Sequence, residues 1–230
     1  METRDKLFNM VVEAFGSPNF LRAFSQRIPI IYGESKSRTY DEDLVDEAFH
    51  TYHFGQERYT LSQSLFLSVA REFGLGTRIQ RCETNGFPIA VVSVGRFDFT
   101  LHHGQTRSEI NCINTSLIRR QHSAINNELI QPSLFRTPTF NDDKLNDAET
   151  IYANIIEGCG GNGISFSEYG FLRIAFPCLH IKDGKESFVF VENYDLHDVL
   201  RVLIENEHRD EEVKPLVDVA IPKIKKNKLS

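Results

Sequence analysis

Tryptophan is absent from the 230-residue chain, methionine occurs twice and cysteine four times. The cysteines, Cys82, Cys112, Cys159 and Cys178, are far apart, and no two of them form a CxxC pair. Such a spacing carries no signature of a zinc site or of a disulfide framework. We therefore expect reduced thiols and a cytoplasmic protein.

Long apolar runs are also lacking. No window approaches the ~18 consecutive apolar residues that a membrane-spanning helix needs. The opening "METRDKLFNMVVEAF" begins with charges and then repeats apolar residues at helical spacing, unlike a signal peptide. We expect neither a secretory leader nor a membrane segment.

The charge balance is acidic. Lysine and arginine number 26 against 32 acidic residues, for a formal net charge of −6. A protein whose whole surface binds nucleic acid normally has a basic face, so this balance argues against that class. It leaves room for a local basic patch.

Phenylalanine is abundant, with 18 residues, and the chain is 40% hydrophobic and 25% charged. This composition is typical of an ordinary globular protein, and the length suits one large domain or two small ones. Phenylalanine is expected to fill much of the core.

Helical patterns dominate residues 1–77. An apolar stripe follows residues 4–15, a short helix is expected over 17–27, and "IPIIYGESKSR" is expected to begin as an apolar run and continue as a loop. Capping boxes at Thr39 and Thr60 predict two further helices, over 40–52 and 60–73. This part either packs on the rest or forms a separate domain.

Strand patterns begin near residue 78. The run "GFPIAVVSV" predicts a strand covered on both faces, and "RFDFTLH" alternates apolar and polar residues. Asp98 and His102 therefore share one face of a strand, and His103 faces the other way if the strand continues.

Helices and a hairpin are expected in the second half. A helix is predicted over "TSLIRRQHSAINNEL" and another over 142–158, ending at Gly158. Asp183 and Gly184 lie between two apolar runs and predict a hairpin, and Asp195 begins the last helix.

The expected fold class is α+β, with an antiparallel sheet of four to six strands packed with helices and preceded by a mainly helical N-terminal part. The predicted units are residues 1–77, an α+β core over 78–205 and a charged tail over 206–230.

The first candidate site is the acid and histidine of "RFDFTLHHGQ". At about 3.3 Å per residue, Asp98 and His102 lie roughly 13 Å apart along the strand, too far for a direct general-base pair. With Glu109 from the following loop, they form a candidate catalytic set that could also ligate a metal. The alternative is a polar strand face that ends in a turn.

A second candidate site is the polar face of the helix that follows. Arg119, Arg120 and Asn127 offer charge and several N–H donors to a phosphate group. The alternative is a solvated helix face. The loop "GCGGNG" resembles a phosphate loop only in composition, because it is expected to follow a helix and not a strand.

No nucleophile motif and no confident zinc motif is present. We therefore predict a non-catalytic binding protein that recognises a partner protein or a polyanionic ligand. The first alternative is a metal-dependent enzyme that processes phosphodiesters or nucleotides with Asp98, His102 and Glu109. The second is a DNA-associated regulator that uses the helices over 40–52 and 60–73. The metal, any cofactor and the oligomeric state are left open.

Overall fold

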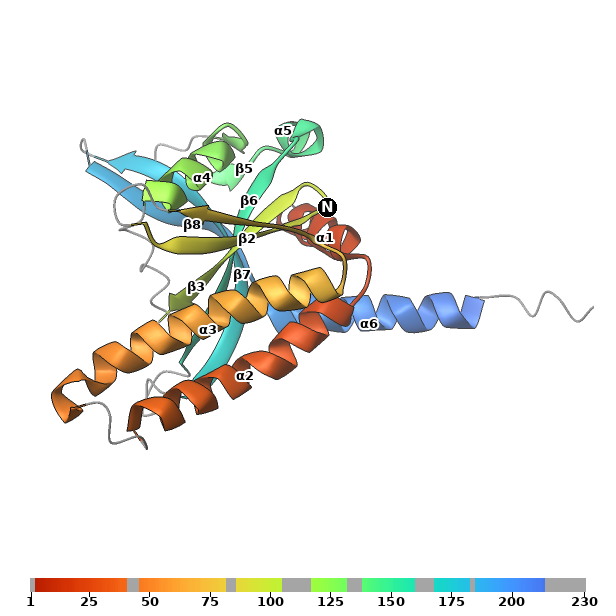
Figure 1. Ribbon diagram of the computed structural model, residues 1–230. Coiled ribbons are helices and arrows are strands. Elements are labelled where there is room, and N and C mark those ends of the chain that lie inside the picture. The colour runs from red at the N-terminus through yellow and green to blue at the C-terminus, as the bar shows by residue number, and fades with distance from the viewer. Residues whose placement is uncertain are drawn as a thin grey trace, which may run out of the picture.

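A computed structural model shows the arrangement of the chain (Figure 1). The structure describes residues 3–40, 46–81, 86–104, 117–131, 138–159, 168–182 and 185–213. Among them, no helix is both long and apolar enough to span a membrane.

Helices come first in the chain and the sheet follows. The N-terminal part contains α1 (Thr3–Phe15), α2 (Asn19–Tyr40), the short 3-10 helix η1 (Glu47–Phe49) and α3 (His50–Glu72). The strands are β1 (Gly76–Arg81), β2 (Pro88–Val94), β3 (Phe97–Gly104), β4 (Ile130–Gln131), β5 (Thr139–Phe140), β6 (Ile151–Cys159), β7 (Tyr169–Lys182) and β8 (Lys185–Asp195). The remaining helices are α4 (Leu117–Asn127), α5 (Asp142–Asp147) and α6 (Leu196–Val213).

The main sheet has six strands within the described residues, in the order β1-β2-β3-β6-β7-β8. All neighbours pair antiparallel except β3 and β6, which run parallel. The α+β prediction, with an antiparallel sheet after a helical N-terminal part, is confirmed, with one parallel pair as a refinement. β7 and β8 form the predicted hairpin, with Lys182 opposite Lys185.

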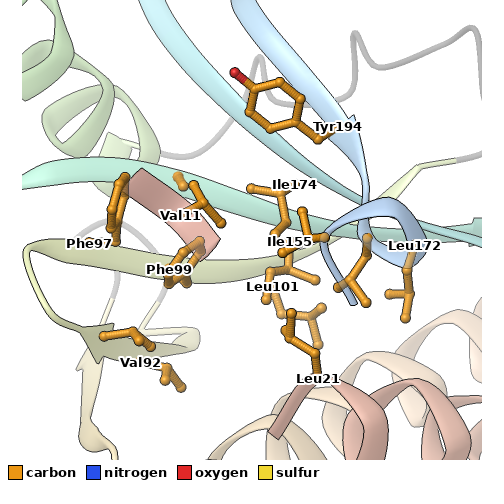
Figure 2. Close-up of a cluster of buried hydrophobic side chains, with 14 of the residues drawn as sticks. Val11, Leu21, Val92, Phe97, Phe99, Leu101, Ile155, Leu172, Ile174 and Tyr194 are labelled. Carbon is orange, nitrogen blue, oxygen red and sulfur yellow. The ribbon is translucent and has the colours of Figure 1, made fainter. Parts of the chain in front are cut away.

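Helices cover both faces of this sheet. The α2–α3 pair lies on one side and α4 on the other (Figure 1). The main core forms between the sheet and α1, α2, α3 and α6, and it includes Leu21, Phe99, Leu101, Ile155 and Ile174 (Figure 2). The N-terminal helices and the sheet thus share one hydrophobic core.

α2 is longer than the predicted helix and includes Pro29. Its buried residues Ile28, Tyr32, Ser35 and Thr39 recur every three or four positions, so a single face continues past the proline. The prediction of a loop after "IPII" is wrong, because packing of this face outweighs the proline.

α3 lies where two separate helices, over 40–52 and 60–73, are expected from the sequence. The helix over 60–73 is the second half of one continuous helix, His50–Glu72, and Thr60 donates its hydroxyl to the Gln56 carbonyl inside it. The separate helices that would have formed a helix-turn-helix are therefore absent from the described part of the chain.

β6 corrects a third prediction, because residues 151–158 form a strand and not the end of a helix. All nine residues of β6 are buried, so the polar alternation that marks a half-exposed strand is missing. The "GCGGNG" segment consequently begins at the end of a strand. Residues 160–163 of this segment lie outside the described residues, so the prediction that it lacks the context of a phosphate loop stays a prediction.

Gly158 is required where β3 and β6 meet. A Cβ added there would overlap the carbonyl oxygen of Gly104 and the ring of Phe171. The ends of the parallel pair therefore approach more closely than any residue with a side chain would allow.

Candidate functional site

Thr100 is the centre of a buried network beneath α4. Its hydroxyl donates to Asn154 Oδ1 at 3.0 Å, and contacts Tyr152 Oη at 2.7 Å and His102 Nε2 at 2.8 Å. A hydroxyl has one donor and two acceptor positions, so Tyr152 and His102 must donate to it. This assigns the Nε2–H tautomer to His102. We call Thr100, His102, Tyr152 and Asn154 the α4-side network.

Asn126 joins α4 to the strands that carry this network through hydrogen bonds of its side chain. Its Nδ2 donates to the Tyr152 and Pro177 carbonyls, and its Oδ1 accepts from the Tyr152 amide at 2.9 Å. The Pro177 carbonyl is available beside the irregularity that interrupts β7–β8 pairing at Phe176 and Pro177. Asn127 acts similarly, because its Oδ1 accepts from the Leu179 amide.

Asp98 lies on the face of the sheet that α4 covers, but its carboxylate is bound by other residues than those of the α4-side network. Its carboxylate accepts hydrogen bonds from Arg78 at 2.6 Å and from Ser93 at 2.6 Å. Burial opposes ionisation of Asp98, but the bonds from Arg78 and Ser93 outweigh it and lower its pKa. Asp98 is thus held ionised in an ion pair, close to the sheet edge.

The predicted site residues are only partly placed by the described residues. Asp98 and His102 share the face covered by α4, as expected, and Arg120 is half-buried on α4 itself. Glu109 and the side chain of Arg119 lie outside the described residues. Their role as catalytic or phosphate-binding groups stays a prediction, and the described residues contain no group of three His, Cys, Asp or Glu suited to hold a metal ion.

His103 faces the opposite side of the sheet, which confirms the strand alternation through Gly104. There it meets a second polar group that the sequence analysis did not identify. Tyr32 of α2, Arg58 of α3, His103 of β3 and Glu157 of β6 converge beneath the α2–α3 pair. We call these four residues the buried charged cluster.

The contacts within the buried charged cluster are long. Arg58 Nε lies 3.9 Å from Glu157 Oε1, and His103 Nδ1 lies 4.0 Å from the same oxygen. The Tyr32 hydroxyl lies 3.2 Å from His103 Nδ1, within hydrogen-bond distance. The Arg58 guanidinium lies 5.4 Å from the centre of the Tyr32 ring and 5.4 Å from that of Phe54. Two aromatic rings therefore hold the guanidinium in place.

Burial controls the charges of this cluster. Glu157 is 2% exposed and Arg58 7%. Burial raises the pKa of Glu157, while Arg58 and the hydroxyls of Tyr32 and Ser62 oppose the rise. Burial, aided by the charge of Arg58, lowers the pKa of His103 to about 3, and burial raises the pKa of Tyr32. His103 and Tyr32 are therefore neutral at physiological pH.

A third feature lies at the β1 edge of the sheet. β1 is the edge strand, and β2 is its strand neighbour in the described part of the chain. A groove of about 160 Å³ lies between this edge and α3. It is lined by Tyr59, Thr60, Gln63, Ser64, Leu67, Ile79, Phe87, Pro88 and Ala90. We call it the edge groove.

Aromatic and basic side chains frame the edge groove. The rings of Tyr59 and Phe87 meet edge to face at 5.8 Å, and Ile79 is 55% exposed. Arg71 bonds Thr77 and Arg81 bonds the Gly86 carbonyl on the groove side, while Arg78 projects from the other face of β1.

Comparisons of the chain with protein-family models, with curated proteins and with solved structures found no match.

Proposed function

We propose that the protein binds an extended, acidic segment of a partner protein along β1, with one apolar side chain of that segment in the edge groove. The observation that carries this proposal is an edge strand bordered by arginines and adjoining an apolar groove. The sequence predicts a partner protein or a polyanionic ligand, and our proposal specifies an acidic peptide segment of a partner protein.

An edge strand supplies affinity through its backbone. The unpaired N–H and C=O groups of such a strand can pair with an added strand, while a pocket beside it selects the side chains. In the edge groove, Leu67 and Ala90 are buried, and Ile79 and Phe87 remain partly exposed. Covering Ile79 and Phe87 with a partner side chain would bury apolar surface that now faces water.

The local charge selects an acidic partner. The whole chain carries a net charge of −6, yet β1 and the adjoining end of α3 present Arg71 and Arg81 beside the edge groove, while Arg78 on the other face of β1 is paired with Asp98. A basic strip on an acidic protein attracts acidic segments and repels basic ones. Pairing of β1 with β1 of a second copy would bring the arginines of the two strands, Arg78 and Arg81, close to one another, which is unfavourable across strands.

The experiment is a selection of short peptides from a random library on the full chain. We expect enrichment of sequences with acidic residues on both sides of an apolar residue. Ile79→Glu and Arg81→Glu should each weaken binding of a selected peptide by about tenfold or more. The controls are Ile30→Glu, at a similarly exposed isoleucine of α2, and Arg201→Glu on α6, which should leave the affinity unchanged.

Three results would contradict the proposal. Enrichment of basic peptides, or of none, would exclude an acidic partner segment. Binding that resists Ile79→Glu would place the peptide elsewhere. A homodimer that Ile79→Glu dissociates would assign the edge groove to a second copy of the chain.

A further inference from the structure

The buried charged cluster contains polar atoms that have no partner within the described residues. These atoms are Arg58 Nε, Glu157 Oε2 and, beside them, Ser62 Oγ. Ser62 is 1% exposed and lies on α3 one turn after Arg58. Two elements of the fold, α3 and β6, therefore direct unsatisfied polar atoms to one place.

Such an arrangement is costly unless a further group completes it. A buried guanidinium loses strong hydrogen bonds to water, and the separation of 3.9 Å from Glu157 is too long to replace them. A polar contact of this length can be bridged by a water molecule or by another polar group. Arg58 is positioned by the Tyr32 and Phe54 rings, so its donors are preorganised.

We propose that Arg58, Glu157 and His103 form a buried receptor for a small oxyanion, a carboxylate or a phosphate group. Arg58 donates a hydrogen bond to one oxygen of the oxyanion, and the protonated carboxyl of Glu157 donates a hydrogen bond to a second oxygen of the oxyanion. His103 stays neutral and is held by Tyr32. This inference does not depend on the partner-binding proposal, because β1 is not part of the cluster.

The charge arithmetic favours an anion. Ionised Glu157 neutralises Arg58, whereas protonated Glu157 leaves one positive charge in the cluster for an anion to balance. Binding therefore takes up a proton from solvent at Glu157 when that residue is ionised in the free protein. Anion affinity should fall as the pH rises and Glu157 loses its proton.

The groups that face Glu157 come from each neighbouring element. They are Tyr32 of α2, Arg58 and Ser62 of α3, His103 of β3 and Cys159 of β6 itself. Arg58 is the one permanent charge among them, since burial keeps Tyr32, His103 and Cys159 neutral at physiological pH. The proton on Glu157 is thus the variable that sets the charge of the receptor.

The cluster is not sealed from solvent. The side chain of Arg58 keeps 9% of its surface exposed and that of His103 keeps 21%. These exposed atoms give a small anion a point of approach without opening the main core.

The first experiment measures thermal unfolding and calorimetric binding of the full chain with acetate, inorganic phosphate and neutral acetamide at equal ionic strength. A ligand of the folded state raises the melting temperature. We expect acetate or phosphate to do so and acetamide to have no effect, and the more effective anion identifies the ligand class. Arg58→Gln should weaken this binding by about tenfold to hundredfold, as loss of a charged hydrogen bond predicts. Arg201→Gln, at an exposed arginine, is the control.

A second variant distinguishes a receptor from a structural ion pair. Glu157→Gln keeps the shape of the side chain but cannot ionise, so we expect anion binding at least as tight as in the unaltered protein. We also expect acetate affinity to lose its pH dependence above about pH 6, where acetate itself stays ionised. A structural Arg58–Glu157 pair predicts a destabilised variant without increased anion affinity.

The proposal is overturned if neither anion raises the melting temperature, or if the rise persists in Arg58→Gln. It is also overturned if Glu157→Gln weakens anion binding. Because these experiments leave β1 unchanged, their failure is separate from a failure of the partner-binding proposal.

Discussion

His102 and His103 are adjacent in the chain, yet they belong to two polar regions of different character. His102 lies in the α4-side network, where neutral groups make hydrogen bonds of 2.7–3.0 Å around Thr100. His103 lies in the buried charged cluster, where Glu157 is 3.9–4.0 Å from its basic neighbours. Short bonds between neutral groups indicate a structural role, whereas long contacts between buried charges leave capacity for a ligand.

The largest expected effect comes from breaking the α4-side network. Thr100→Val removes the hydroxyl and leaves Tyr152, Asn154 and His102 without their shared partner. Since a buried group that loses a hydrogen bond costs about 1–3 kcal/mol, we expect a loss of about 3–5 kcal/mol in the free energy of unfolding. Urea unfolding measures it.

The matched control is Thr60→Val on α3, where the hydroxyl is exposed. We expect this change to stay within about 0.5 kcal/mol. Equal stability of the two variants would show that Thr100 does not hold the network together.

A smaller loss should follow from Gly158→Ala, which affects the strand ends that carry both regions. The added Cβ would force β3 and β6 apart at Gly104, for a loss of about 2–3 kcal/mol. The same substitution at Gly55, which has open space around it inside α3, should stabilise the protein by about 0.5–1 kcal/mol. Thermal unfolding that shifted both variants in the same direction would contradict this difference.

The decrease in the free energy of unfolding at acidic pH should depend on His103. Its pKa is about 3 when folded against 6.5 for the free side chain. As the pH falls from 6.5 toward 3, the imidazole takes up a proton in the unfolded state before it does so in the folded state. The free energy of unfolding therefore decreases by at most about 1.4 kcal/mol for each unit by which the pH falls. His103→Asn should flatten this fall, while His197→Asn, at an exposed histidine of α6, should leave it as it is. An unchanged decrease at acidic pH in His103→Asn would show that burial does not keep this imidazole neutral.

The smallest effect concerns Asp98. Arg78 is largely exposed, so the double-mutant cycle of Asp98→Asn and Arg78→Gln should give a coupling of about 1 kcal/mol or less. A coupling of several kcal/mol would mean that Asp98 is buried more deeply than its ion pair indicates.

Sequence patterns were most informative where one face of an element meets water or polar groups. The alternation of "RFDFTLH" correctly placed Asp98 and His102 together and His103 opposite, because a strand has a period of two. β6 was mistaken for a helix because it is buried on both faces and its apolar spacing also fits a helix.

The sequence analysis does not identify the buried charged cluster, in part because β6, which carries Glu157, is predicted as a helix. Glu157 falls within the helix predicted over 142–158, and Arg58 falls between the helices predicted over 40–52 and 60–73. The two residues are 99 positions apart in the chain, and only the parallel pairing of β3 with β6 brings Glu157 beside His103. One signal was available, since Glu157 is the single acid in the otherwise uncharged run "IYANIIEGC".

The proton on Glu157 is the most direct test of the contrast between the two regions. A carbon-detected NMR titration of its side-chain carboxyl, assigned with Glu157→Gln, measures its pKa. We predict a value above 4.5, because burial outweighs Arg58, and with it a free energy of unfolding that declines as the pH rises from 4.5 through that pKa. A value below 4.5 would contradict the account, since it would show that Arg58 and Glu157 form an ordinary stabilising ion pair.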